Sequence, residues 1–211
     1  MLVLAVDTAT TAVTAGLVAL ENGAVRTVAS RISVQSRGHA ELLTPLILEC
    51  LAEAQVARSD LDAVVAGIGP GPFTGLRVGM ATAAAFGDAL AIAVHGVCSL
   101  DAIAADVRND KELLVVTDAR RREVYWARYR YGDRVEGPGV CAPSAVEIGD
   151  AELIAGSPSH VDLFDLPVEP VESPSPLGLV AVAAEALLAG REPQPLEPLY
   201  LRRPDAVEPA R

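Results

Sequence analysis

A chain of 211 residues is long enough for one large domain or two small ones, each with its own core. Hydrophobic residues make up 51% of the chain and the mean hydropathy is +0.32, which excludes a disordered protein. The formal net charge of −11 excludes a broadly basic surface for nucleic acid, so any contact with RNA must be local or supplied by another protein.

The N-terminal segment 1–6 is apolar and runs directly into Asp7, without a basic region or a small-residue cleavage site, so it predicts a strand rather than a signal peptide. The longest apolar stretch, 80–94, is interrupted by Asp88 and is shorter than the roughly 20 residues needed to cross a bilayer. The three cysteines are widely spaced and form no Cys-x-x-Cys pair. These features predict a cytoplasmic protein with reduced thiols and no membrane contact.

Short Val-rich runs alternate with Ala/Leu-rich ones, which predicts an α/β fold. In the first half of the chain the expected strands are 2–6, 13–19 and 25–32, an antiparallel meander, followed by 63–68 and 91–95. The expected helices are 39–54, with Pro45 in its first turn or at a kink, and a helix that Thr74 caps and that runs to about Leu90.

A shorter series of elements follows. Strand 113–117 ends at Asp118 and pairs in a hairpin with 124–131, and this arrangement repeats the N-terminal one, in which a strand ends at Asp7. A duplicated hairpin core explains the repeat, although a strand that ends in an Asp turn is also common by chance. The elements expected after it are a Pro-rich linker over 167–176, a helix over 177–189 that stops at Gly190, and a surface tail that docks only through 199–201.

The segment 67–79 is rich in glycine and lies between a buried strand and a helix, where a backbone can approach an anion closely. Gly71 and Thr74 are therefore candidate phosphate contacts. The segment is neither a Walker A nor a Rossmann motif, and Pro70 and Pro72 remove two N–H donors, so a tight structural turn is the alternative.

Small residues recur every four positions along the helix that follows this segment. A row of glycines costs helix stability and so requires a compensating close approach of another backbone. Packing within the chain is one explanation. A subunit interface shared with the amphipathic helix 39–54 is the other, and its predicted residues are Leu42, Leu46, Phe73, Gly75, Arg77, Gly79, Ala83 and Gly87.

Asp7 and Asp118 follow the two repeated strands and, with Thr8, are candidates for holding a hydrated metal or the magnesium of a nucleotide. Each aspartate can instead simply form an Asx turn. Three consecutive arginines, 120–122, make the densest positive patch, which suits phosphate or RNA but is equally typical of a solvated turn.

The sequence offers no catalytic group that stands out. His39, His95 and His160 are isolated, with no metal-binding pair, and no nucleophile elbow is present. The expectation is therefore that there is no catalytic residue and no bound metal.

Several motifs together resemble the TsaB (YeaZ) family, a subunit of the machinery that makes threonylcarbamoyladenosine (t6A) in tRNA. The resemblance spans nearly the whole chain in the same order. The matching pieces are Leu4-Ala5-Val6-Asp7-Thr8, Gly69-x-Gly71-x-Phe73-Thr74-Gly75-x-Arg77-x-Gly79, Ser99-Leu100-Asp101, Asp118-Ala119-Arg120-x-x-Glu123-Val124-Tyr125 and Tyr200-Leu201-Arg202. One departure is Pro72, where the family usually has serine.

The resemblance implies an actin-like ATPase (ASKHA) fold with two ribonuclease-H-like halves, the second reduced. The expected division is 1–105 for the N-terminal half with the dimerisation surface, 106–191 for the C-terminal half and 192–211 for the tail. It also implies a non-catalytic scaffold or activator that pairs with the catalytic subunit TsaD and is joined by the ATPase TsaE, with tRNA bound only through the complex. The resemblance implies that the chain has no intrinsic cofactor and that ATP or ADP with magnesium binds only at the complex interface. It also implies that the chain forms a homodimer when it is alone. An independent ATPase or kinase of the same fold, or a metalloprotease-like hydrolase, is the alternative.

Overall fold

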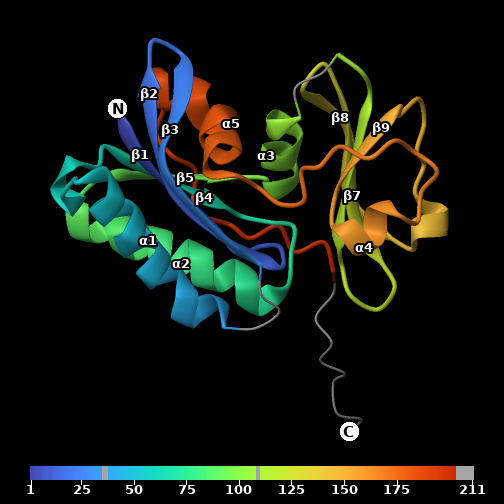
Figure 1. Ribbon diagram of the computed structural model, residues 1–211, viewed down its shortest axis with the longest axis horizontal. Helices are drawn as coiled ribbons and strands as arrows, with labels where there is room; N and C mark the ends of the chain where they lie inside the picture. Colours follow the sequence, from blue (N-terminus) through green and yellow to red (C-terminus); the bar gives the residue numbers. More distant parts are fainter. Residues whose placement is uncertain (35–37, 108–109, 203–211) are drawn as a thin grey trace, which may run out of the picture.

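The computed structural model describes residues 1–34, 38–107 and 110–202, and it forms two halves that each contain a β-sheet (Figure 1). The sheet of the N-terminal half has the strand order β3-β2-β1-β4-β5. Strands β1 to β3 pair antiparallel, whereas β4 pairs parallel with both β1 and β5. The strands are β1 (Leu2–Asp7), β2 (Ala12–Glu21), β3 (Ala24–Val34), β4 (Ala63–Gly67) and β5 (Ala93–Val97).

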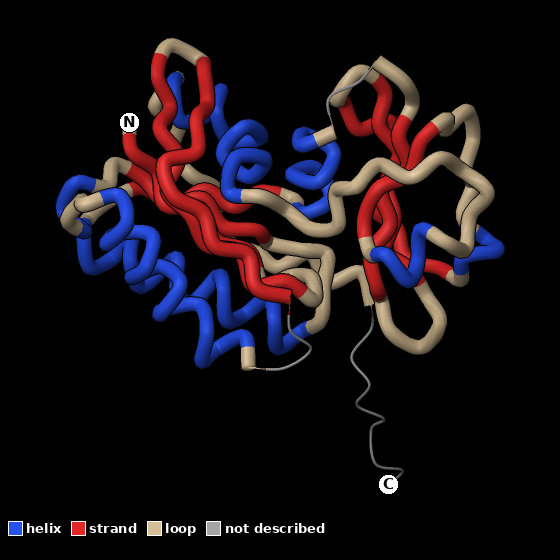
Figure 2. Tube along the Cα trace, in the orientation of Figure 1, coloured by secondary structure: helices blue, strands red, loops and turns tan. Residues whose placement is uncertain are grey.

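Helices cover both faces of this sheet, which explains why β1, β2 and β4 are buried almost throughout. Helices α1 (His39–Ala54) and α2 (Phe73–Leu90) lie side by side on one face (Figure 2). Leu43 and Ile47 of α1 fill the core there with Val64 of β4. Helix α5 (Pro176–Leu188) packs on the opposite face together with α3 (Ser99–Asp106). The fold is therefore an α/β/α sandwich in its first half.

The sheet of the C-terminal half is smaller and has the order β8-β7-β6-β9. Its strands are β6 (Leu113–Asp118), β7 (Val124–Arg130), β8 (Asp133–Cys141) and β9 (Leu153–Gly156), followed by the short helix α4 (Pro158–Val161). Two 3₁₀ turns, Arg58–Asp60 and Pro143–Ala145, lie outside the sheets. Helix α3 contributes Leu100 and Ile103 to the core of this half and Ala102 to the core shared with α5, so it joins the two halves.

The predicted repeat of the hairpin core is confirmed. Strands β6, β7 and β8 pair antiparallel in the same order as β1, β2 and β3, and β9 pairs parallel with β6 as β4 does with β1. Asp7 and Asp118 each end the central strand of their sheet. The second half lacks a counterpart of β5 among its described strands and is reduced, as expected.

One local expectation is wrong, and two open points are decided. Thr74 lies inside α2 and does not cap it, because the cap position is Pro72, which has extended backbone angles and no side-chain donor or acceptor. Pro45 lies inside α1 and beyond its first turn, which excludes the first-turn alternative. Helix α5, although it falls within the range 106–191, packs on the first sheet, because its apolar residues cover Val3 and Ala5 of β1.

The C-terminal segment 192–202 returns across both halves. The backbone N–H of Leu199 donates to the carbonyl of Ile68 (2.8 Å), and Arg202 Nη1 donates to the carbonyl of Ala119 (2.7 Å). Leu199 and Leu201 pack against the core of the C-terminal half. The predicted docking of 199–201 is confirmed, but Leu196 docks as well, against Leu76 and Met80. The segment ties the two halves together.

In the ranges 1–34, 38–107 and 110–202, no helix is both long and apolar enough to span a membrane.

Candidate functional site: the cleft between the halves

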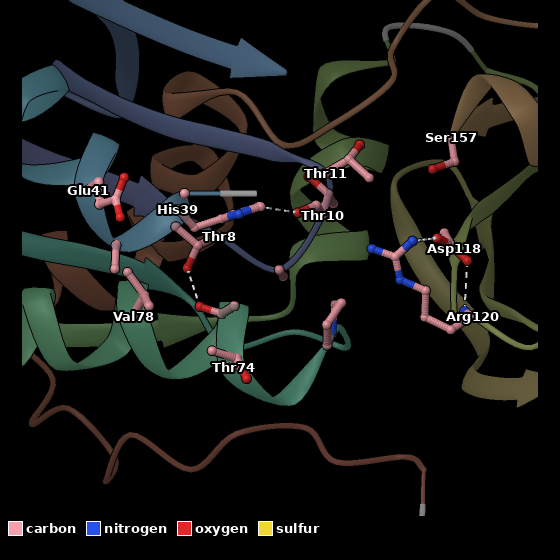
Figure 3. Close-up of a pocket in the computed structure, with 15 residues that line it drawn as sticks. Thr8, Thr10, Thr11, His39, Glu41, Thr74, Val78, Asp118, Arg120 and Ser157 are labelled. Carbon is pink, nitrogen blue, oxygen red and sulfur yellow. Dashed lines mark hydrogen bonds and ion pairs between the residues drawn. The ribbon is translucent and has the colours of Figure 1, made fainter. Parts of the chain in front are cut away.

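A cavity of about 430 Å³ lies between the two halves (Figure 3). The end of β1, the N-terminus of α1, the first turns of α2 and the turn after β6 form its walls. The residues that line it are Thr8, Ala9, Thr10, Thr11, Gly38, His39, Ala40, Glu41, Pro72, Thr74, Gly75, Val78, Asp118, Arg120 and Ser157.

Thr8 joins the end of β1 to the first turns of α2. Its hydroxyl donates to the carbonyl of Gly75 (2.6 Å) and accepts from the N–H of Gly79 (2.9 Å), two groups one helical turn apart. Only 1% of Thr8 is exposed. The hydroxyl therefore uses its hydrogen-bonding capacity on the helix and holds the cleft wall together.

Replacing Thr8 with valine keeps the shape of the side chain and removes both hydrogen bonds. We expect the free energy of unfolding to fall by about 2 kcal/mol, since each such bond contributes about 1 kcal/mol. Urea denaturation measures this loss. The serine variant keeps the hydroxyl and should lose less; a valine variant as stable as the serine variant would contradict this role.

Asp7 does not line the cleft, because its side chain is fully buried behind Thr8. One carboxylate oxygen accepts from the N–H of Ala9 (2.8 Å), and the other accepts from the hydroxyl of Ser99 at the start of α3 (2.5 Å). Burial raises the pKa of Asp7 to about 6, although the Ser99 and Ala9 hydrogen bonds act in the opposite direction. Asp7 is thus a structural group that connects β1 with α3.

Asp118 lines the opposite wall of the cleft and is held by its neighbours. It accepts from the N–H of Arg120 (2.7 Å) and pairs with the guanidinium of the same residue (3.0 Å), while His160 Nε2 lies 3.5 Å away. The Asx-turn interpretation therefore describes both aspartates, because each accepts from the N–H two residues ahead.

Of the five residues expected to bind a nucleotide, Thr8, Thr74 and Asp118 line the cleft, whereas Asp7 and Gly71 do not. Gly71 packs on the backbone of Ala9: a Cβ added to it would lie 2.2 Å from that carbonyl oxygen. Magnesium requires accessible oxygen ligands. Here one carboxylate is buried and the other is paired with Arg120, so these residues do not fit a magnesium-nucleotide site formed by this chain alone.

The glycine row of α2 faces the interior of the chain, which corrects the predicted subunit interface. A Cβ on Gly75 or Gly79 would lie 2.6 Å from an oxygen of Thr8, and a Cβ on Gly87 would lie 2.2 Å from Val94 of β5. Ala83 is 1% exposed. These small residues let α2 approach Thr8 and β5; Gly79, Ala83 and Gly87 are buried, whereas Gly75 is half-buried and lines the cleft.

The other four predicted interface residues differ in exposure. Leu42 and Leu46 are half-buried and pack against the core beneath α1. Phe73 is 53% exposed and Arg77 is exposed, with its guanidinium 4.0 Å from the centre of the Phe73 ring. Of the eight predicted residues, Phe73 and Arg77 are the most exposed.

Sequence reasoning missed several residues of the cleft. His39, at the N-terminus of α1, has its Nε2 3.1 Å from the carbonyl of Thr10, and Thr11, Glu41 and Ser157 also line the cleft. No short-range motif connects these positions. Only the repeat of the strand-Asp pattern could have indicated that the loops after β1 and β6 face each other.

Two sheets of matching topology on either side of a cleft define an actin-like α/β protein. Comparisons with known proteins agree with this class. Residues 26–164 match the family described as TsaD, tRNA N6-adenosine threonylcarbamoyltransferase. The structure superposes on YeaZ from Pseudomonas aeruginosa with a TM-score of 0.78 and 29% sequence identity, covering 95% of this chain and 99% of that one.

Two further proteins are similar to this chain in sequence. The chain is 58% identical to an uncharacterised protein of Mycobacterium leprae over 97% of its own length and 56% of that protein. It is 33% identical to the tRNA threonylcarbamoyladenosine biosynthesis protein TsaB of Escherichia coli over 62% of its length and 55% of that protein. The matches thus span about half the length of these two relatives. This chain belongs to the TsaB/YeaZ branch of the TsaD family.

Proposed function

We propose that this chain is the TsaB-like subunit of a complex that makes threonylcarbamoyladenosine in tRNA, and that it supports a TsaD-like catalytic subunit without performing the chemistry itself. Its family membership supports the pathway. The observation that supports the non-catalytic role is the hydrogen bonding and ion pairing of the polar groups in and behind the cleft. The polar groups that end the two central strands are bonded to the chain itself.

A catalytic cleft of this fold must present charged or polar groups to a phosphate or to a metal. In this chain the hydroxyl of Thr8 holds α2, the carboxyl of Asp7 is buried against Ser99, and the carboxylate of Asp118 is paired with Arg120. These groups stabilise the cleft instead of facing a reactant. The two halves of this chain therefore fit the role of a rigid, non-catalytic subunit better than that of an independent ATPase, kinase or hydrolase.

The surface that we propose for TsaD is the outer side of α1 and α2, which replaces the glycine row as the docking surface. Ala81, Ala85 and Ala89 of α2 are exposed on this side, and Leu48 of α1 is 40% exposed. Helices whose contact residues are small can pack at short interaxial distance. The two helices lie next to each other on the same face of the sheet, so the surface is continuous (Figure 1).

The other expected partners follow from the same proposal. TsaE joins the complex, tRNA meets the complex in the cytoplasm, and a bound ATP or ADP with magnesium requires residues from a second subunit, since the cleft residues of this chain are engaged. Alone, the chain can pair with itself through the same outer side of α1 and α2.

Replacing Ala85 with arginine places a charged side chain at the centre of this surface. We expect affinity for the TsaD-like subunit of the same organism to fall at least about tenfold, because the charge must be desolvated within a helix interface. Calorimetric titration measures the dissociation constant. The threonylcarbamoyladenosine content of tRNA is measured in cells in which the variant gene replaces the parental one.

The matched control is Ala24→Arg, which introduces the same side chain at an exposed position at the start of β3. It should bind the TsaD-like subunit as the parent does. Equal affinity of both variants would overturn the docking surface. Normal threonylcarbamoyladenosine in cells that lack this chain altogether would overturn the proposed function.

A further inference from the structure

A second cavity, of about 740 Å³, is lined by residues of the loop 69–73 and shares Pro72 and Arg120 with the cleft. It forms where the C-terminal segment crosses the N-terminus of α2 and the turn after β6. Phe73, Arg120, Arg121, Tyr125, Tyr200 and Arg202 line it, and its remaining lining residues are uncharged.

The lining of this cavity has a charge opposite to that of the chain. It contains three arginines and no acidic residue, although the chain carries a net charge of −11. Arg120 pairs with Asp118, and Arg202 pairs with Glu123 and the carbonyl of Ala119, so acidic groups behind the wall hold two of the guanidiniums in place. A fixed group of guanidiniums matches the geometry of a phosphate.

Aromatic rings stand beside the arginines. Phe73 and Tyr200 stack with their ring centres 5.2 Å apart, yet they remain 53% and 41% exposed. Arg77 holds the pair, because its guanidinium lies over Phe73 and its Nε donates to the Tyr200 hydroxyl (2.9 Å). A partly exposed stacked pair is a platform for a planar ring, and aromatics make up only 4% of this chain.

The turn that carries the arginines has an uncommon backbone. Arg120, Arg121 and Arg122 have φ values of 63°, 51° and 64°, in the left-handed region that favours glycine. Such a conformation costs energy at each position, and three consecutive residues in it distinguish this turn from the single left-handed residues Gln55 and Ala91 at helix ends. It presents consecutive exposed arginines at the mouth of the cavity.

We propose that this cavity binds one nucleotide of single-stranded RNA, with its phosphate on Arg120, Arg121 and Arg202 and its base on the Phe73–Tyr200 stack. This inference rests on the proposed function in one respect, since an RNA substrate brings such a nucleotide to the complex. It gives the chain a direct, local contact with RNA that its overall negative charge does not predict. A free mononucleotide offers the same chemistry and is the other source to be tested.

The experiment measures binding of a fluorescein-labelled, single-stranded oligoribonucleotide to the full chain by fluorescence anisotropy at several salt concentrations. We expect Arg121→Glu to weaken binding at least about tenfold and to reduce the slope of log K against log salt by about 0.7 for each phosphate that the protein no longer neutralises. The control Arg26→Glu changes the net charge equally at an exposed site on β3 and should leave affinity within about twofold.

The base platform is tested separately. Tyr200→Leu removes one ring of the stack, and affinity should fall about tenfold, whereas Tyr200→Phe keeps the ring, loses only the hydrogen bond from Arg77, and should weaken binding less. Equal weakening by Arg121→Glu and Arg26→Glu, or no effect of either Arg121→Glu or Tyr200→Leu, would overturn the proposal.

Competition with AMP distinguishes single-stranded RNA from a free mononucleotide as the ligand of this cavity. Displacement of the oligonucleotide by AMP at a similar concentration supports the cavity with a free nucleotide as its ligand, and failure of AMP to compete supports RNA. Loss of TsaD binding leaves these measurements unchanged, so failure of this inference and failure of the proposed function are distinguishable.

Discussion

Replacing Gly79 with leucine should destabilise the folded chain by about 3 kcal/mol or more. A Cβ at this position lies 2.6 Å from Thr8 Oγ1, whose hydrogen bonds to Gly75 and Gly79 then break. Overpacking of a buried site costs about 1–3 kcal/mol, and each buried polar group left unpaired costs about as much again. The better helix propensity of leucine recovers only about 1 kcal/mol.

Urea denaturation compares this variant with Ala85→Leu, which adds leucine to the exposed side of the same helix. The control should change the free energy of unfolding by no more than about 0.5 kcal/mol. If Gly79→Leu instead folds as stably as the parent and only loses the TsaD-like partner, the glycine row is a subunit interface after all, and the inward packing described above is wrong.

The stability of the chain should depend on the protonation of Asp7. Its pKa is 3.8 in the unfolded reference and about 6 in the folded chain, so the folded state binds the proton more tightly. The stabilisation from this group is complete below about pH 4 and is lost as the pH rises through about 6. The shift of about two pKa units corresponds to about 3 kcal/mol between these limits.

Asp7→Asn removes the titrating group and keeps a side chain of the same shape. We expect the variant to gain about 3 kcal/mol relative to the parent between about pH 4 and pH 7, because only the parent must bury a carboxylate. Denaturation curves across this range measure the difference. Asp162→Asn, at an exposed position, is the control, and its free energy of unfolding should follow that of the parent at every pH. If the free energy of unfolding of Asp7→Asn also changed with pH as that of the parent does, the predicted effect of burying Asp7 would be wrong.

Much of the fold can be predicted from the sequence, because it depends on local patterns. The apolar stripe of 39–54 has the period of a helix, and α1 has these same bounds. The strands that end at Asp7 and Asp118 repeat a motif, and the two sheets repeat the same topology. Residue spacing therefore predicts the strands and α-helices up to β5 and indicates the repeat, whereas α3, β8, β9 and α4 were not among the expected elements.

The candidate site is less predictable, because it combines residues from distant segments. Motifs point to Thr8, Thr74 and Asp118, which do line the cleft, but His39 and Ser157 join it only through tertiary packing. The burial of Asp7 is likewise not evident from local sequence, since its partner Ser99 is 92 positions away in the chain.

Composition and periodicity are sufficient for the α/β class, most of the strands and helices of the first half, and the presence of a helix rich in small residues. They do not show which side of α2 faces inward, and packing on the sheet settles that point. Both sides carry small residues, Gly79, Ala83 and Gly87 on one and Ala81, Ala85 and Ala89 on the other. The period of a helix shows which residues share a side, but the sheet selects between two such sides, because only the glycines let a backbone come within reach of Thr8 and Val94.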